Sequence, residues 1–144
     1  MQDDAPFDLR DFLPYLLNQA ADASSRDFQS YYKGKYGMLR TEWRVLFHLG
    51  RYGAMTARQV CDRAGIHKTK VSRAVAALDS KRFIRREEMA HDRRHEELRL
   101  TAQGRSVFAD LTQEAQRFDA AMLAEFTETE VKQIRAFLTR IARL

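Results

Sequence analysis

The sequence predicts a mainly α-helical fold with a small β element (α+β): six helices and one two-stranded hairpin. Apolar residues recur every three or four positions along most of the 144 residues, which is the period of an amphipathic helix. Clear alternation is confined to one charged stretch, residues 84–100. The length suits one domain or one intertwined protomer, and the 44% hydrophobic residues suffice for a core.

The N-terminal part is expected to form an arm and one long helix. Residues 1–12 read as an extended arm with several apolar side chains. Pro14 suits the first turn of a helix, where its missing N–H costs nothing, and the helix should run to about Tyr31. Residues 33–37, KGKYG, are expected to form a loop, after which Thr41 can cap a second helix.

The middle of the chain carries strong start and stop signals. Gly50 and Gly53 are expected to end the second helix. Thr56 and Gln59 have the spacing of a capping box and should start a third helix. Gly65 should end it, because glycine adopts a left-handed backbone without strain.

A fourth helix, the hairpin and two further helices follow. The fourth helix is expected over residues 67–82, and the strands over residues 84–88 and 96–100. Thr101 can cap a long fifth helix, and Thr127 a last helix with heptad-like apolar spacing.

The third and fourth helices have the spacing of a helix-turn-helix. Cys61 supplies the small residue at the helix crossing, Gly65 the turn, and Val71 the buried aliphatic position. The outward face of the fourth helix is crowded with donors for phosphate oxygens and for the acceptor-rich edge of guanine. These candidate DNA-binding residues are His67, Lys68, Thr69, Lys70, Ser72 and Arg73.

The hairpin has the character of a wing. Its tip is expected over residues 89–95 and contains Asp92, Arg93 and Arg94. An arginine at such a tip can enter the minor groove, where the negative potential is strong, and Asp92 can brace an arginine or the turn.

The positive charge of the chain is concentrated in this part. Residues 56–104 contain 12 Lys and Arg against 7 Asp and Glu, whereas the rest of the chain has 13 of each. The net charge of +5 therefore lies on the helix-turn-helix and the hairpin, which favours a polyanion as partner.

The segments GIHKTKVSRAVAALDSKRFIRRE and HDRRHEELRLTAQG resemble the MarR family of bacterial transcription regulators. The positions that carry the resemblance are Leu78, Lys81, Arg82, Asp92, Arg93, Arg94, Leu98, Arg99, Leu100, Thr101 and Gly104. The resemblance implies a six-helix winged helix-turn-helix with a two-stranded β-wing, intertwined as a homodimer through its N- and C-terminal helices. It also implies that Arg94 is the wing arginine, braced by Asp92. The basic start of the recognition helix departs from the hydroxyl-rich start common in the family.

On this basis the chain divides into three parts. We expect an N-terminal dimerisation arm and helix over residues 1–35, a DNA-binding domain over 36–104, and C-terminal dimerisation helices over 105–144. The long amphipathic helices outside the DNA-reading module favour a second copy of the chain as their partner.

The resemblance also implies an effector site between the dimer helices and the DNA-reading module. The lining expected here is Tyr15, Asn18, Trp43, Arg44 and His48. Arg44 and His48 share a helix face and could hold the carboxylate of a small aromatic acid. A core role for Trp43 and an ion pair for Arg44 are the simpler interpretation.

Other functions than transcription regulation have weaker support in the sequence. A redox sensor would need an accessible thiol of low pKa, whereas Cys61 is expected to be buried at a helix crossing. A metal site at His91 and His95 is disfavoured, because four-residue spacing across a hairpin tip does not bring the rings together. The chain has no phosphate loop or nucleophile elbow typical of an enzyme. A non-specific architectural DNA-binding protein would carry the same basic surface.

The sequence therefore predicts a sequence-specific regulator that binds double-stranded DNA at a palindromic operator. We expect a homodimeric repressor released by a small ligand, with no cofactor and no enzymatic activity. The acidic start and the lack of a long apolar run favour a cytoplasmic protein that does not engage the membrane.

Overall fold

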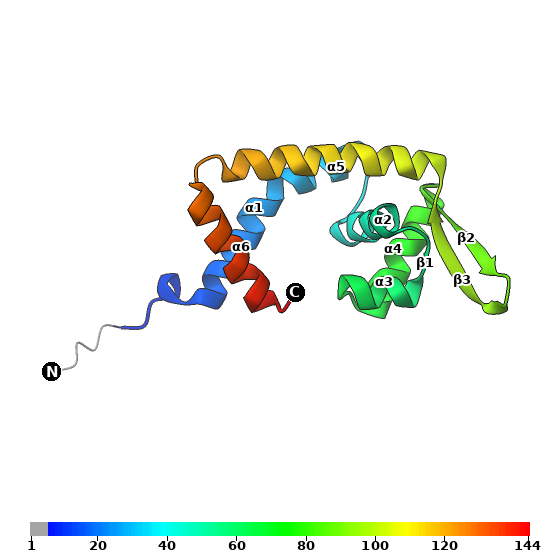
Figure 1. The fold of residues 1–144 in the computed structure, drawn as a ribbon, viewed down its shortest axis with the longest axis horizontal. Coiled ribbons are helices and arrows are strands. Elements are labelled where there is room, and N and C mark those ends of the chain that lie inside the picture. The colour runs from blue at the N-terminus through cyan, green and yellow to red at the C-terminus, as the bar shows by residue number, and fades with distance from the viewer. Residues whose placement is uncertain (1–5) are drawn as a thin grey trace.

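The computed structural model describes residues 6–144, and of Arg93 it describes the backbone alone (Figure 1). The elements are a short 3-10 helix Leu9–Asp11, α1 Leu13–Tyr36, α2 Arg40–Tyr52, β1 Met55–Thr56, α3 Ala57–Ala64, α4 Lys68–Ser80, β2 Ile84–Met89, β3 Asp92–Leu100, α5 Ala102–Leu123 and α6 Glu128–Ala142. The six expected helices and the hairpin are therefore confirmed.

The helices are arranged around the long α5. Figure 1 shows α5 along one edge, with α1 and α6 at one end and α2, α3, α4 and the hairpin at the other. The core lies mainly in the second group, where apolar residues from α2, α3, α4 and the strands are buried together. The first group is more open, and α6 has no buried residue.

The sheet has three strands rather than two, in the order β1-β3-β2. The additional strand, β1, pairs antiparallel with β3 through Met55 and Leu98. A strand of two residues is too short to show alternation, so it could not be predicted from the sequence pattern. The hairpin strands are longer than expected, because β2 continues to Met89 and β3 already begins at Asp92.

Two expected helix ends were wrong. The first helix continues through residues 33–36 and stops only at Gly37, which has the left-handed φ of 61°. The second helix does not end at Gly50, which lies inside α2 where a side chain would collide with the ring of Phe108. The helix ends at Gly53 instead.

The start of α2 also differs from the expectation. Leu39 rather than Thr41 is the N-cap residue, and the carboxylate of Glu42 accepts a hydrogen bond from the Leu39 amide. Glu42 is only 4% exposed and forms an ion pair of 3.0 Å with Lys81. This pair ties the start of α2 to the end of α4, because a buried carboxylate requires a partner.

A close joint connects α5 to the loop between α4 and β2. The Thr101 amide donates to the carbonyl of Phe83 at 3.0 Å, and the Thr101 hydroxyl donates to the carbonyl of Arg82 at 2.7 Å. Gly104 packs so closely on Phe83 that a methyl group there would overlap the Phe83 carbonyl. The start of α5 is therefore fixed to the end of the recognition helix and to the base of the wing.

A second joint connects α5 to α1 through the carboxylate of Asp110. This carboxylate accepts hydrogen bonds from the hydroxyls of Tyr31 and Tyr36 and from the ammonium of Lys35. The Tyr36 hydrogen bond is the main cause that holds the pKa of Asp110 below its usual value. Burial, together with the Asp110 carboxylate, raises the pKa of Tyr36 to about 12.

The termini expose a large apolar surface. The exposed side chains lie on the N-terminal arm, α1, α5, α6 and the loop between α5 and α6. They include Leu13, Leu16, Met122, Phe126, Phe137, Leu138 and Ile141. Along the part of the chain that the structure describes, no helix is both long and apolar enough to cross a membrane.

Candidate nucleic-acid interface

The helix-turn-helix consists of α3, a short turn and α4. Thr56 and Gln59 form the expected capping box, with the Gln59 amide donating to the Thr56 hydroxyl at 3.2 Å. Gly65 has a φ of 64° and ends α3, as its position predicted. The turn thus sets α4 beside α3 with its first residues at the molecular surface.

The recognition helix α4 has two distinct faces. Its buried side chains are Val71, Ala74, Val75 and Leu78, which recur at helical spacing and pack into the core. Its exposed side chains include Lys68, Thr69, Lys70, Ser72 and Arg73. Five of the six predicted helix residues are therefore exposed to solvent along α4.

His67 differs from these five, because it is the N-cap residue of α4. Its Nδ1 accepts a hydrogen bond from the Thr69 amide at 3.2 Å. This contact supports the helix start and leaves the exposed ring at the edge of the donor surface.

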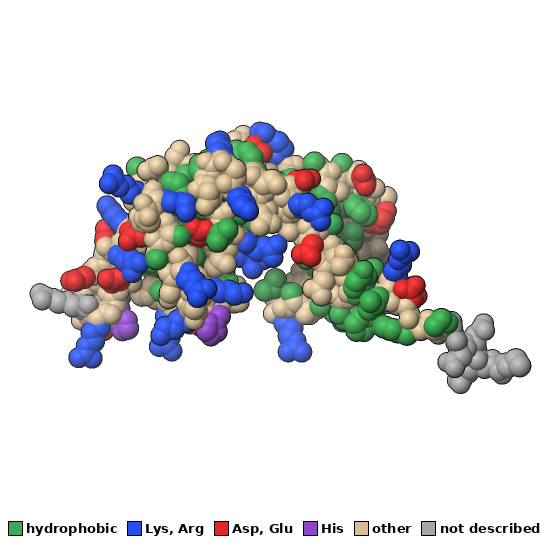
Figure 2. All heavy atoms as spheres, turned by 180° about the vertical axis from the view of Figure 1, so that it is seen from behind, with side chains coloured by type: hydrophobic (Ala, Val, Ile, Leu, Met, Phe, Trp, Pro, Cys, Tyr) green, Lys and Arg blue, Asp and Glu red, His purple; other side chains and the backbone are tan. Residues whose placement is uncertain are grey.

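The cations of the donor surface are not neutralised by neighbours. No ion pair among the described side chains involves Lys68, Lys70 or Arg73. Several acids of the chain pair instead with other cations. Figure 2 shows Lys and Arg side chains projecting along the lower edge of the molecule, the side on which Figure 1 places α3. Unpaired cations on one edge are available to phosphate groups.

The charged residues expected in the hairpin turn lie on strand β3 instead. The turn between β2 and β3 is only Ala90 and His91, so the expected tip over residues 89–95 was too long. Asp92 accepts a hydrogen bond from the backbone amide of Arg94 at 3.0 Å and lies 3.4 Å from the ring of His95. Asp92 therefore braces the turn through the Arg94 backbone, and the Arg93 side chain lies outside the described atoms.

The arginines of the wing stem are neutralised by acids of the wing and of α4. Arg99 contacts Glu87 at 3.3 Å and Glu97 at 3.5 Å, and Arg86 contacts Asp79 at 3.5 Å and Glu96 at 3.7 Å. Arg94, in contrast, has no ion pair among the described side chains and is exposed. The free positive charge of the wing thus lies near its tip.

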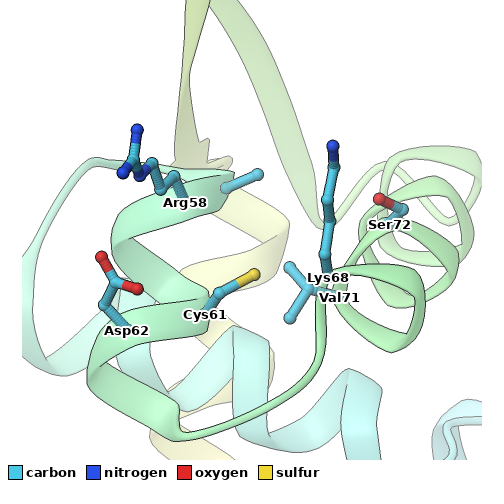
Figure 3. Close-up of a pocket in the computed structure, with 7 residues that line it drawn as sticks. Arg58, Cys61, Asp62, Lys68, Val71 and Ser72 are labelled. Atoms are coloured by element: carbon cyan, nitrogen blue, oxygen red, sulfur yellow. The ribbon is translucent and has the colours of Figure 1, made fainter.

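A cleft of about 430 Å³ separates α3 from α4. Figure 3 shows Cys61 and Val71 facing each other from the two helices, while Arg58 and Lys68 extend outward in a common direction. The helix-crossing role of Cys61 and Val71 agrees with their spacing. Cys61 is only partly buried, however, so the expectation of a fully buried thiol was wrong.

The residues expected to line an effector site lie near the start of α1 and along α2. Trp43 packs in an aromatic cluster, with its ring centre 5.0 Å from that of Phe28. His48 Nδ1 donates to the Arg44 carbonyl at 2.6 Å, so these two do share a helix face. Tyr15 is partly buried and Asn18 is exposed, both near the start of α1.

Among the described residues, no cluster of three or more His, Cys, Asp or Glu side chains could hold a metal ion. His91 is exposed in the wing turn, and His95 contacts Asp92.

One exposed cation of the interface is absent from the residues predicted from the sequence. Arg58 lies in the first turn of α3 and lines the hollows on both sides of it, one toward α4 and one toward the wing. Its position directly after the Thr56 cap was a usable signal, because the first turn of the leading helix in this motif lies close to the recognition helix.

Comparison with known proteins agrees with this geometry. Residues 36–95 match the MarR family. The uncharacterised HTH-type transcriptional regulator YwaE of Bacillus subtilis is 25% identical over 107 residues, which are 74% of this chain and 63% of that relative. The matched stretch is thus less than two thirds of the relative's length.

Solved structures share the fold over almost the whole chain. BpsR of Bordetella bronchiseptica, whose DNA binding is described as regulated by 6-hydroxynicotinic acid, has a TM-score of 0.87 at 18% identity, covering 97% of this chain and 99% of its own. A MarR/EmrR-family regulator from Acinetobacter sp. ADP1 has a TM-score of 0.82 at 24% identity, covering 95% and 96%. The winged module of this chain is thus similar to the MarR family, and its overall fold is that of solved winged-helix transcriptional regulators.

Proposed function

We propose that the protein is a homodimeric repressor that binds a palindromic operator in double-stranded DNA. The observation that carries the proposal is the surface of α4, where five donor side chains are exposed opposite the buried stripe of the helix. In this proposal α4 enters the major groove, where Thr69, Lys70 and Arg73 contact base edges and Lys68 and Ser72 contact phosphates. His67 adds a contact at the helix start.

The wing completes the contact in the adjacent minor groove. Arg94 is the proposed groove-entering side chain, supported by its exposure and by its lack of a described ion pair. Asp92 holds the Arg94 backbone, and Arg93 is a further proposed contact. The narrow minor groove attracts arginine through its enhanced negative potential.

The dimer is supported by the exposed apolar side chains of the terminal helices. Leu138 of α6 and Leu16 of α1 are each 43% exposed in the single chain, and Phe137 is 42% exposed. A second copy of the chain would bury them, at about 25 cal/mol per Å² of apolar surface. Residues 1–35 and 105–144 would then form the dimer, and residues 36–104 would read the DNA.

Ligand control is the finer part of the proposal. A small aromatic acid held by Tyr15, Asn18, Trp43, Arg44 and His48 would release the operator if it bound the non-binding arrangement of the dimer more tightly. The neighbouring positions of Arg44 and His48 on α2 and the effect of 6-hydroxynicotinic acid on the similarly folded BpsR support this idea.

The decisive experiment is selection of bound duplexes from a random pool, followed by affinity measurements on the selected operator. A palindromic site bound about 10³-fold more tightly than scrambled DNA is the expected result. A ratio near one would favour a non-specific architectural protein. Arg73→Ala should lower this ratio, whereas Arg105→Ala, which removes an exposed arginine of α5, should leave it unchanged.

A redox-responsive regulator is the second candidate, favoured by one observation. Cys61 lies in the cleft between α3 and α4 and is partly exposed, so an oxidant could reach its thiol. Any oxidised form of Cys61 would enlarge a side chain at the crossing that orients the recognition helix.

A further inference from the structure

Tyr36, the last residue of α1, touches two other parts of the molecule. Its ring meets the ring of Phe83 edge to face, with the ring centres 6.1 Å apart and the planes at 87°. Its hydroxyl donates a hydrogen bond to the carboxylate of Asp110 on α5. Phe83 lies between α4 and β2, so one side chain joins α1 and α5 to the winged module, here the segment from α2 to β3.

The winged module is connected to the helices outside it by two short links. Residues 37–39 connect α1 to α2, and Thr101 alone connects β3 to α5 (Figure 1). Met38 of the first link is fully buried, and Thr101 of the second is hydrogen-bonded to the carbonyls of Arg82 and Phe83. Because both links are short and fixed to the module, its orientation depends on the angle between α1 and α5.

Three contacts close this angle into a triangle. Gly104 of α5 and Tyr36 of α1 both pack on Phe83. The third side is the hydrogen bond from Tyr36 to Asp110, which lies about 9 Å along α5 from Gly104. Loss of this third side would leave the triangle open, so that the angle between α1 and α5 could change.

The carboxylate of Asp110 accepts hydrogen bonds from the last two turns of α1. Besides Tyr36, the hydroxyl of Tyr31 and the ammonium of Lys35 each donate to it at 3.0 Å. Burial, together with the Asp110 carboxylate, raises the pKa of Tyr36 to about 12, so its hydroxyl remains a donor at neutral pH. The joint is therefore intact under the conditions in which DNA binding is measured.

We propose that the hydrogen bond between Tyr36 and Asp110 is a positioning contact that determines which spacing of operator half-sites the dimer accepts. A dimer binds two half-sites whose separation matches the distance between its recognition helices. In the proposed dimer, the angle that this bond holds in each protomer sets that distance. The inference rests on the proposed function and assigns a role to two residues outside the exposed donors of α4.

A positioning contact has a signature that a merely stabilising contact lacks. Moving one half-site by one base pair shifts it by about 3.4 Å and rotates it by about 35°, so a rigid dimer should lose roughly tenfold in affinity per step. Tyr36→Phe keeps the ring on Phe83 but removes the donor to Asp110. This variant should reduce the penalty per step by up to about fivefold, the factor that corresponds to one hydrogen bond.

Two further variants complete the series. Asp110→Ala removes the acceptor of both Tyr31 and Tyr36, and should broaden the spacing preference more than Tyr36→Phe does. Tyr52→Phe is the matched control, because it removes the same hydroxyl from a tyrosine that is 48% exposed at the end of α2. It should keep the spacing preference of the unmodified protein.

The experiment is fluorescence anisotropy on labelled palindromes that differ only in the separation of their half-sites. The half-sites are those of the selected operator, at the selected separation and at one or two base pairs more or fewer. Light scattering and circular dichroism at the same protomer concentration report the assembly and the fold of each variant. The readout is the ratio of the affinities for the best and the shifted palindromes, which a change in the folded fraction alone does not alter.

The expected result is a weaker dependence of affinity on spacing for Tyr36→Phe than for Tyr52→Phe. A loss by the same factor at every spacing would overturn the inference, because the hydrogen bond would then only stabilise the fold. An unchanged spacing dependence, or the same change in Tyr52→Phe, would also overturn it, and the proposed function would stand in each of these cases. Failure of the unmodified protein to prefer any palindrome over scrambled DNA would overturn the proposed function and the inference with it.

Discussion

Removal of the Asp110 carboxylate should destabilise the protein far more than its surface position suggests. Asp110→Ala leaves the hydroxyls of Tyr31 and Tyr36 without their common acceptor. It also disconnects α1 from α5, since these hydrogen bonds join positions 74 and 79 residues apart in the sequence.

The magnitude follows from the number and exposure of the bonds. Hydrogen bonds to charged groups contribute about 1.5–3 kcal/mol each. The Asp110 side chain is 26% exposed, so water can replace part of each bond, and about 1 kcal/mol per tyrosine is the appropriate value. The contact with Lys35 is exposed and is assigned no contribution to the free energy of unfolding. The expected loss is about 2 kcal/mol, or roughly 6 °C in the melting temperature.

The matched control lies on the same helix. Asp119 forms an exposed ion pair of 2.8 Å with Arg135, and its side chain is 51% exposed. Asp119→Ala should therefore cost less than about 1 kcal/mol. Urea unfolding of both variants at one protomer concentration and neutral pH measures the difference. Equal stability of the two variants would refute the reasoning.

The contribution of Asp110 to stability should also depend on pH, in a direction set by its lowered pKa. The pKa of Asp110 is lowered in the folded protein, so its contribution is present above its unfolded pKa of about 3.9. The contribution is lost as the pH falls through the lower, folded value. The stability difference between the unmodified protein and Asp110→Ala should thus be constant between about pH 6 and pH 9 and shrink below about pH 4. A difference that persists undiminished in acid would contradict the role of the carboxylate.

Four further predictions follow from the structure. Gly104→Ala should cost about 3 kcal/mol in the free energy of unfolding, because the methyl overlaps a backbone carbonyl, whereas Gly34→Ala, with open space around it, should be neutral or slightly stabilising in the same urea titration. Leu138→Asp should convert a dimer to a monomer in light scattering and abolish operator binding, and a monomer with full DNA affinity would contradict the proposed assembly. Tyr36→Phe should remove the part of the alkaline stability loss that occurs between about pH 10 and the folded pKa of about 12, because the raised pKa of Tyr36 favours its protonated form in the folded state. Oxidant treatment should weaken operator binding of the unmodified protein but not of Cys61→Ser if the thiol is a sensor, and an equal response of both proteins would remove that role.

The starts of α3, α5 and α6 and the helix-turn-helix could be predicted from the sequence because their signals are local. Thr56, Thr101 and Thr127 each accept a hydrogen bond from the amide three residues later, as the capping rule requires. Gly65 ends α3 for an equally local reason, its left-handed backbone. The exposure of the donor side chains of α4 could be predicted from the helical period alone.

The features that were missed depend on residues far apart in the chain. The two-residue strand β1 exists only because β3 lies beside it. Glu42 became the capping acid of α2 because Lys81, 39 residues later, completes its pairing. Arg58 joins the interface only when the wing folds back beside α3. Gly50 could not be distinguished from a helix stop without the ring of Phe108 packed against it.

The single uninterrupted α5 has a mechanical consequence. Its 22 residues correspond to a rod of about 33 Å, anchored near one end by Gly104 and joined to α1 one and a half turns later by Asp110. A rod of this length, pivoting by about 10°, moves its far end by roughly 6 Å. That displacement is close to two base-pair steps of about 3.4 Å. In the proposed dimer, a slight tilt at the interface would therefore suffice to shift the two α4 helices out of register with their half-sites.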